Sequence, residues 1–485
     1  MLGAILMALV LLLDDVWHSS KLDFVHRHPA EAAIGAAIVL AALAAVAYVI
    51  RRRPWLIAHL TMLTLPFRIP IQAGGNTSNL LVPLYFVVAA GAFAWIVPTL
   101  WAHRLGNGGL SSSQQRPPRH LFEQLLAASV VLYSVQALYS PRFSNALQNE
   151  AFFYVPFSVL LALLRDVEWD RELLLRCLGV TIALALIFAF IGFGEELTQT
   201  LWLNSGLIEA NQLHAYFQVN SVFYDPNIFG RYLALVMILL ATVLLYDRRV
   251  RNQLFAILAL AILWGCLIYT LSRSSLVALA LGMAVLAALR WRARPVLYLG
   301  VLVVIAGVVV VASRPAEFGL AGNLNVASSG RASLISNGVK LFRERPLQGW
   351  GSGSFSTEYQ HKFPASARTV SDSHNIPVTV ASEQGVIGLI FYLALVVTAI
   401  ITLLRGARGD PFRIAIAAAF LALLLHTMLY ADFLEDPVTW TLLGIGGALA
   451  TASAAREPTF RSYPGRGYDR GAIGSSETRT QGVKR

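Results

Sequence analysis

The chain has 485 residues, of which 56% are hydrophobic and 13% charged, and its mean hydropathy is +0.61. Soluble domains carry about 25% charged residues, and half that density cannot cover the surface of a water-soluble globule this large. The composition therefore excludes a cytosolic enzyme, and the high apolar content excludes a disordered chain. The formal net charge of +11 raises nucleic acid as a partner, so the basic residues must first be compared with membrane topology.

Apolar runs long enough to cross a bilayer, about 20 residues each, recur along almost the whole chain. About 13 of them are predicted, at residues 32–50, 55–71, 80–101, 121–139, 151–164, 173–193, 228–246, 254–271, 274–289, 295–313, 376–404, 412–430 and 438–455. Residues 2–13 form a further, short run. No Lys or Arg precedes it and no small-residue cleavage site follows it, so it resembles a short or tilted first span more than a signal peptide.

The basic residues gather in every second loop. Six loops hold three arginines each, at residues 51–53, 104–119, 165–176, 248–251, 290–294 and 405–413, and the opposite short turns hold only Arg68, Arg142 and Arg273. The tail, 456–485, adds seven more basic residues and is expected to be a disordered cytoplasmic end. Under the positive-inside rule this charge is an orientation signal, so no nucleic-acid partner is predicted.

Two segments on the opposite, extracytoplasmic side are too long to be turns, at 194–227 and 314–375. The predicted fold is all-α: one polytopic membrane domain over 1–455, with about 12–14 transmembrane helices and one large external loop that contains short helices. Within this loop, 331–345 has the pattern of an amphipathic helix ended by Pro346. Such a helix lies on the membrane surface or packs onto the rest of the loop.

The first candidate for chemistry is His374, which stands between Ser373 and Asn375 at the end of the large loop. Nine residues separate Asn375 from Gly385, and Gly388 follows. A histidine at this position is often only a cap or a surface residue, and the glycines could simply allow close helix packing. Its other role is that of a base, because the ordinary pKa of about 6.5 suits proton transfer near neutral pH.

Arginines on the outward side are the second group of candidates. Arg273 lies at the tip of a tight turn between two spans, where an unpaired charge is expensive and suggests function unless the side chain reaches the lipid headgroups. Gly330-Arg331 and the glycine-rich segment from Gly349 to Gly353 indicate a tight backbone path close to a ligand or a helix. Asp225 before Pro226 is a strong helix start, with ligand binding as the alternative.

No cluster with metal-ligand spacing is present in the sequence, which contains no Asp-x-Asp pair and no Cys/His set. Two arginines can hold a diphosphate through bidentate, charge-assisted hydrogen bonds, where other enzymes use a divalent cation. Together with a histidine base, this composition suggests transfer from a diphosphate-activated lipid. We expect it to need no metal and no other cofactor.

At these residues the sequence resembles the bacterial O-antigen ligase and O-antigen polymerase superfamily. The ligase signature is His, then Asn, Ser or Gln, nine residues and Gly-x-x-Gly, and His374-Asn375 with Gly385-Val386-Ile387-Gly388 fits each fixed position. Ser272-Arg273-Ser274 resembles the family's Ser-Arg turn, and Gly330-Arg331 with Gly349-Trp350-Gly351 resembles its large-loop motif. The resemblance covers roughly residues 220–400 and implies a polytopic glycosyltransferase of the GT-C type in the bacterial inner membrane.

The resemblance further implies that Arg273 and Arg331 hold the diphosphate of an undecaprenyl-diphosphate glycan donor. His374 would activate or position the acceptor hydroxyl, with inversion at the anomeric carbon on the extracytoplasmic face. The acceptor would be lipid A-core for a ligase, the favoured interpretation, or another lipid-linked glycan for a polymerase. Secondary candidates are Arg68, Asp225, Asn227, Arg231, Asp372, Asn375 and Glu383.

A transporter or flippase of lipid-linked sugars is the alternative from another class. It predicts charged residues near the middle of several spans and an internal repeat. The sequence shows almost no charge in mid-span and no obvious repeat, and a transporter has no need of the His–Gly-x-x-Gly spacing. The residues therefore favour a transferase.

Overall fold

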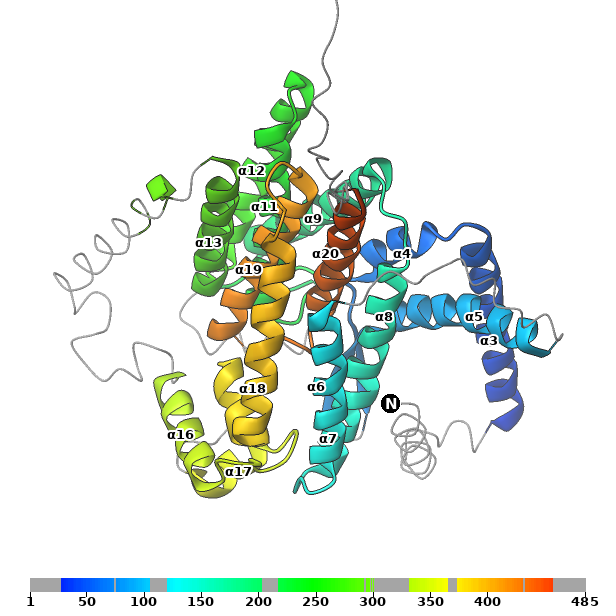
Figure 1. The fold of residues 1–485 in the computed structure, drawn as a ribbon, viewed down its shortest axis with the longest axis vertical. Helices are drawn as coiled ribbons and strands as arrows, with labels where there is room; N and C mark the ends of the chain where they lie inside the picture. The colour runs from blue at the N-terminus through cyan, green and yellow to red at the C-terminus, as the bar shows by residue number, and fades with distance from the viewer. Residues whose placement is uncertain are drawn as a thin grey trace, which may run out of the picture.

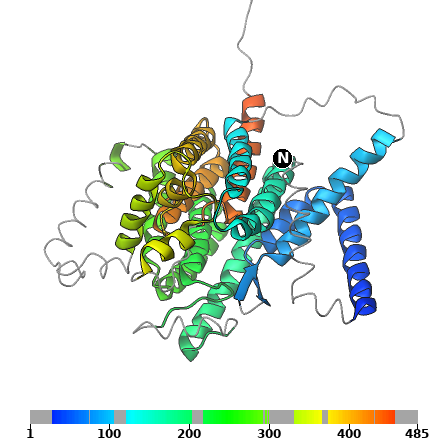
Figure 2. The same ribbon diagram turned by 90° about the horizontal axis from the view of Figure 1, so that it is seen from below.

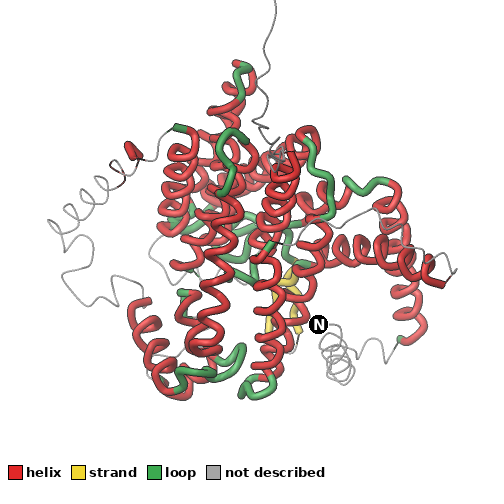
Figure 3. The backbone as a smooth tube through the Cα atoms, viewed as in Figure 1, coloured by secondary structure: helices red, strands yellow, loops and turns green. Residues whose placement is uncertain are grey.

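The computed structural model describes residues 28–73, 76–104, 120–202, 217–291, 331–364, 373–430 and 432–456, together with 294–296, 298 and 300. Helices make up most of these residues, and one hairpin supplies the strands among them (Figure 3). The run predicted at 2–13, most of the run at 295–313 and the tail beyond residue 456 lie outside the described residues.

Eight helical segments in the described part of the chain are long and apolar enough to cross a membrane. They are α3 (Pro29–Arg52), the run Phe143–Arg165, α9 (Arg171–Thr198), α11 (Pro226–Tyr246), α12 (Val250–Tyr269), α13 (Arg273–Arg290), α18 (Ile376–Leu404) and α19 (Pro411–Leu429). The remaining apolar helices are α5 (Val82–Arg104), α6 (Leu121–Ala137) and α20 (Pro437–Arg456). The predicted all-α, polytopic membrane class is confirmed.

Helices α11 and α19 form the centre of the bundle, because both are buried over most of their length (Figure 1). They pack on each other and on α13, where Gly282 leaves no space for a larger residue: an added Cβ would lie 2.2 Å from Cδ1 of Ile238. Small residues let membrane helices approach in this way. The outer helices instead expose large apolar side chains such as Ile187 and Leu254, as helices that face lipid do.

The N-terminal helices extend to one side of this bundle (Figure 2), where α3 packs on α5 and α5 on α4 (Leu56–Thr64). The membrane span predicted at 55–71 is wrong in its second half. Helix α4 ends at Thr64, and an antiparallel hairpin of β1 (Ile69–Ala73) and β2 (Asn76–Leu80) follows. Pro66 and Pro70 explain the difference, because neither can donate a helical backbone hydrogen bond.

The predicted helix of the large loop is present as α16 (Arg331–Glu344), followed by α17 (Phe355–Lys362). Leu341, Phe355 and Tyr359 form a small apolar core between them, and α16 also packs on α18. Of the two arrangements predicted for this helix, the structure therefore shows the one in which it packs onto the rest of the loop. Figure 1 shows both helices beside one end of α18. We call this end of the bundle the loop face; it comprises α16, α17 and the turn between α12 and α13.

Candidate active site

The Ser373–Asn375 turn positions His374 at the start of α18. The Asn375 carboxamide caps the helix by accepting the backbone N–H of Val378 at 3.3 Å, and its Nδ2 donates to the Met428 carbonyl at 3.0 Å. His374 itself has a φ of +52°, in the left-handed region that Asn and His adopt more often than other side chains. The turn is thus fixed to the end of α19, and the imidazole is held between the two helices.

Aromatic and charged groups surround His374. Its ring centroid lies 5.5 Å from that of Tyr430, and Tyr430 in turn lies 5.9 Å from His426. Nδ1 of His374 is buried without a hydrogen-bond partner among the described residues. Burial, followed by the positive charge of Arg331, lowers the pKa of His374 below its ordinary value, and Asp225 opposes the shift. The imidazole is therefore neutral at neutral pH and can accept a proton.

The start of α13 lies on the same face and presents Arg273. Ser272 caps the helix by accepting the backbone N–H of Ser275, and its hydroxyl donates to Oδ1 of Asn227 at 2.9 Å. Asn227 thereby joins the α12–α13 turn to the first turn of α11, which Asp225 caps as predicted. The Arg273 side chain is exposed, so it is available to an anion at this helix start.

His426 is a site residue that the sequence analysis missed. Its Nε2 lies 3.2 Å from the hydroxyl of Ser274 and 3.3 Å from that of Ser275, and the side chain is fully buried. These contacts join α19 to the serines that flank Arg273. A lone histidine inside an apolar span was the available signal, since intramembrane ionisable residues indicate function by default.

Arg231 and Arg68 have structural contacts. Nη2 of Arg231 lies 2.5 Å from Oδ2 of Asp436, and both side chains are almost fully buried, with 3% and 4% exposed. Asp436 also accepts the backbone N–H of Val438 and so begins α20. The Arg68 guanidinium lies 5.0 Å over the ring of Tyr224. The ion pair fastens α11 to the α19–α20 loop, while Nη1 of Arg231 is buried without a hydrogen-bond partner among the described residues.

The glycine-rich loop packs its backbone against a break in α18. At Gly385 the helix is interrupted, with φ +66° and ψ −163°. The loop backbone forms hydrogen bonds with the helix backbone groups at this break. Trp350 N–H donates to the Ser382 carbonyl, Gly351 N–H donates to the Glu383 carbonyl, and Val386 N–H donates to the Pro346 carbonyl. Every such bond is backbone to backbone, so the predicted close path of this loop to a helix is confirmed.

Glu383 contributes its side chain to the same junction. Its two carboxylate oxygens accept the backbone N–H groups of Gly353 and Phe355 at 3.0 and 2.9 Å, which orients the start of α17. Gln136 of α6 donates to the Gln384 carbonyl at 3.2 Å. These contacts identify Glu383 as an anchor of the large loop, and Gly385 as a position where the loop backbone must come close.

We expect Gly385→Ala to destabilise this junction. Its Cβ would lie 2.2 Å from the Leu347 carbonyl oxygen, and its backbone conformation is one that only glycine adopts at low cost. The backbone strain alone costs about 1–3 kcal/mol, and the clash adds to it. Limited proteolysis should cut the Pro346–Gly353 loop faster. Gly179→Ala in α9, where an added Cβ meets nothing within 4 Å, should leave the cleavage rate unchanged; equal cleavage of both variants would contradict this account.

The structure brings several predicted site residues to the loop face. Electrostatic contacts join His374 to Arg331 and Asp225, while Asn375, Asn227 and Arg273 lie at the adjoining helix starts. Asp372 and Gly330 lie outside the described residues. Among the residues described, no group of three or more His, Cys, Asp or Glu side chains could hold a metal ion.

Taken together, the fold and this site define a multi-pass membrane protein with a polar, arginine- and histidine-containing site at one end of its helix bundle. Residues 258–393 match the O-antigen ligase family model, from within α12 to within α18. The match contains Arg273, Arg331 and His374, and it confirms the resemblance to the O-antigen ligase and polymerase superfamily and supports an O-antigen ligase-like function in general. A search of curated proteins found no match.

Proposed function

We propose that the protein is a membrane glycosyltransferase that moves a glycan from an undecaprenyl-diphosphate donor to an acceptor hydroxyl, most simply as an O-antigen ligase with lipid A-core as acceptor. The observation that carries this proposal is the neutral, half-buried His374 close to Arg331. A neutral imidazole close to a cation suits a reaction that removes a proton at one point and develops negative charge at another.

The donor would bind through its diphosphate. Arg273 and Arg331 are the first residues of two helices, α13 and α16, so each stands beside the N-terminal N–H groups of its helix. Guanidinium groups at helix starts combine charge-assisted hydrogen bonds with the favourable end of the helix dipole. These two arginines take the charge-neutralising role of a divalent cation, so the proposed reaction requires no metal.

The transfer itself is a single displacement. His374 accepts the proton of the acceptor hydroxyl as its oxygen forms a bond to the anomeric carbon. The bond between that carbon and the diphosphate oxygen breaks, and undecaprenyl diphosphate leaves with the electron pair, held by the arginines. Attack opposite the leaving group inverts the anomeric configuration.

Reconstitution tests this function. We expect the purified protein, in liposomes with an undecaprenyl-diphosphate-linked glycan and lipid A-core, to transfer the glycan in one step in the presence of excess EDTA. A ladder of repeats without lipid A-core would assign it as a polymerase of the same superfamily. Loss of transfer in EDTA that returns with a divalent cation would contradict the two-arginine mechanism. Movement of the donor across the bilayer without transfer would assign a flippase.

A further inference from the structure

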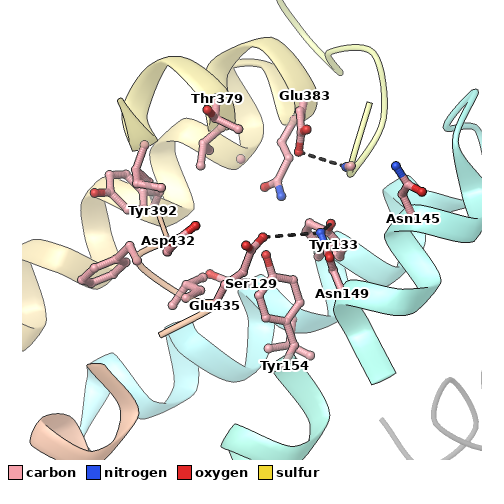
Figure 4. Close-up of a pocket in the computed structure, with 18 of the residues that line it drawn as sticks. Ser129, Tyr133, Asn145, Asn149, Tyr154, Thr379, Glu383, Tyr392, Asp432 and Glu435 are labelled. Atoms are coloured by element: carbon pink, nitrogen blue, oxygen red, sulfur yellow. Dashed lines mark hydrogen bonds between the residues drawn. The ribbon is translucent and has the colours of Figure 1, made fainter. Parts of the chain in front are cut away.

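A cavity of about 360 Å³ lies beside the first half of α18, the helix that follows His374 in the chain (Figure 4). Side chains of α6, α7 (Phe143–Asn149), α18 and the α19–α20 loop line it. Figure 4 shows Tyr133, Asn149 and Tyr154 on one side and Thr379 and Glu383 on the other. Neither the ion pair of Arg231 nor the serine turn of α13 belongs to its lining, so it is a separate site.

The charge of the lining argues against a diphosphate. Asp432, Glu435 and Glu383 contribute carboxylates, and none of the described residues that line the cavity is a lysine or an arginine. An acidic cavity repels a diphosphate and accepts hydrogen bonds from hydroxyl groups. The ligand group that this cavity binds must therefore be one other than the diphosphate.

The remaining lining fits a sugar. Asn145 and Gln148 present carboxamides with no side-chain hydrogen-bond partner among the described residues, and a carboxamide both donates to and accepts from hydroxyls. Tyr154 and Tyr392 add aromatic surface, against which the C–H face of a sugar ring can pack. Polar groups converging on a partly apolar hollow are typical of small-molecule sites.

The backbone between α7 and α8 (Val155–Arg165) shapes this wall. A π-helical turn, η2 (Glu150–Tyr154), interrupts the run, and Val155 N–H bonds to the Glu150 carbonyl. Pro156 explains the irregularity, because it lacks the N–H that would continue the α-helical ladder. Asn149 precedes the turn, Tyr154 ends it and both line the cavity, and π-turns of this kind occur frequently at functional sites.

The cavity also borders the catalytic face. Ile376 and Thr379, in the first turn of α18, line it and stand two and five positions after His374 in the chain. Asp432 lines it as well and lies within electrostatic range of Arg231. A molecule in the cavity therefore lies beside the start of α18, which His374 precedes in the chain.

We propose that this cavity binds the sugar of the glycan acceptor and directs its hydroxyl toward His374. The inference rests on the proposed transferase function but concerns binding, so it can be tested without transfer. The variant of choice is Asn145→Ala/Gln148→Ala, since Asn145 is half-buried, Gln148 is exposed and neither side chain holds the fold together. Ser144→Ala, an exposed position on the same helix outside the lining, is the matched control.

The probes are the core oligosaccharide released from lipopolysaccharide by mild acid and, separately, the unlipidated repeat-unit glycan. Binding to the full-length protein in nanodiscs is measured by saturation-transfer NMR without donor. We expect one of the two glycans to bind. The double variant should raise the Kd of this glycan about tenfold or more, and Ser144→Ala should leave the Kd unchanged. Inorganic pyrophosphate should not displace it.

Binding of neither glycan, an unchanged Kd in the double variant, or displacement by pyrophosphate would overturn the assignment. The failure of the proposed function gives a different result. In that case the wild-type protein does not transfer glycan in liposomes, but it still binds the oligosaccharide, and the double variant still binds it more weakly than the wild type does.

Discussion

His374→Ala is expected to reduce glycan transfer by roughly 10²–10⁴-fold, the usual contribution of a positioned general base. The loss should appear in kcat at saturating donor and acceptor, because the imidazole acts on the proton that moves in the transition state. The fold should persist, since the side chain is only half-buried and its Nδ1 makes no hydrogen bond to a described residue. Transfer is measured with purified protein in liposomes, with thermal unfolding as the check on folding.

His361→Ala is the matched control, because His361 is an exposed histidine of α17 in the same large loop. It should transfer at the wild-type rate. Wild-type activity in His374→Ala, or an equal loss in both variants, would show that His374 is not the base.

The pH dependence of kcat gives a second measurement of the same role. The base must be neutral, so transfer should be lost as the pH falls through the pKa of His374, which lies below its ordinary value. Arg331→Gln removes a positive charge that lowers this pKa, so the midpoint should move to higher pH. Asp225→Asn removes a negative charge that raises it, so the midpoint should move to lower pH. Shifts of the same sign in both variants would contradict this assignment.

The sequence predicted those parts of the site that depend on local signals. Asp225 before Pro226 predicted a helix start, and the structure shows Asp225 capping α11. Pro377 likewise predicted the start of a helix, and the structure shows His374 just ahead of that helix, α18. Local hydrogen bonds between a side chain and the next turn of backbone determine these features, so a single sequence contains them.

Contacts between distant segments could not be predicted. Gly385 and Gly349 are 36 positions apart, and their glycine spacing alone did not distinguish helix packing from the loop contact that the structure shows. The acidic segment from Asp432 to Asp436 carries no motif that predicts a site, although it supplies the partner of Arg231 and part of the cavity wall. Arg231 and Asp436 are about 200 residues apart and meet only because the helices around them pack together. A single sequence contains no local pattern that predicts such a contact.

That long-range pairing has a consequence for stability, which Arg231→Met should reveal. The substitution removes the guanidinium that pairs with Asp436, whose side chain is only 4% exposed. Breaking a buried ion pair from one side costs about 3–5 kcal/mol, and methionine preserves most of the side-chain volume. The thermal unfolding temperature in detergent should therefore fall markedly. Arg248→Met, an exposed arginine just beyond the end of α11, should change stability by no more than about 0.5 kcal/mol.

The second substitution distinguishes charge from packing. Asp436→Asn keeps an oxygen that can accept the Val438 N–H and begin α20, but removes the negative charge. In the Arg231→Met background it should restore part of the lost stability, whereas alone it should destabilise by removing the carboxylate that pairs with Arg231. If the two losses simply add, the charges do not interact, and Arg231 would again be a candidate for binding the donor. Recovery in the double variant would instead establish that this arginine holds α11 against the α19–α20 loop, and so keeps the cavity wall in place beside His374.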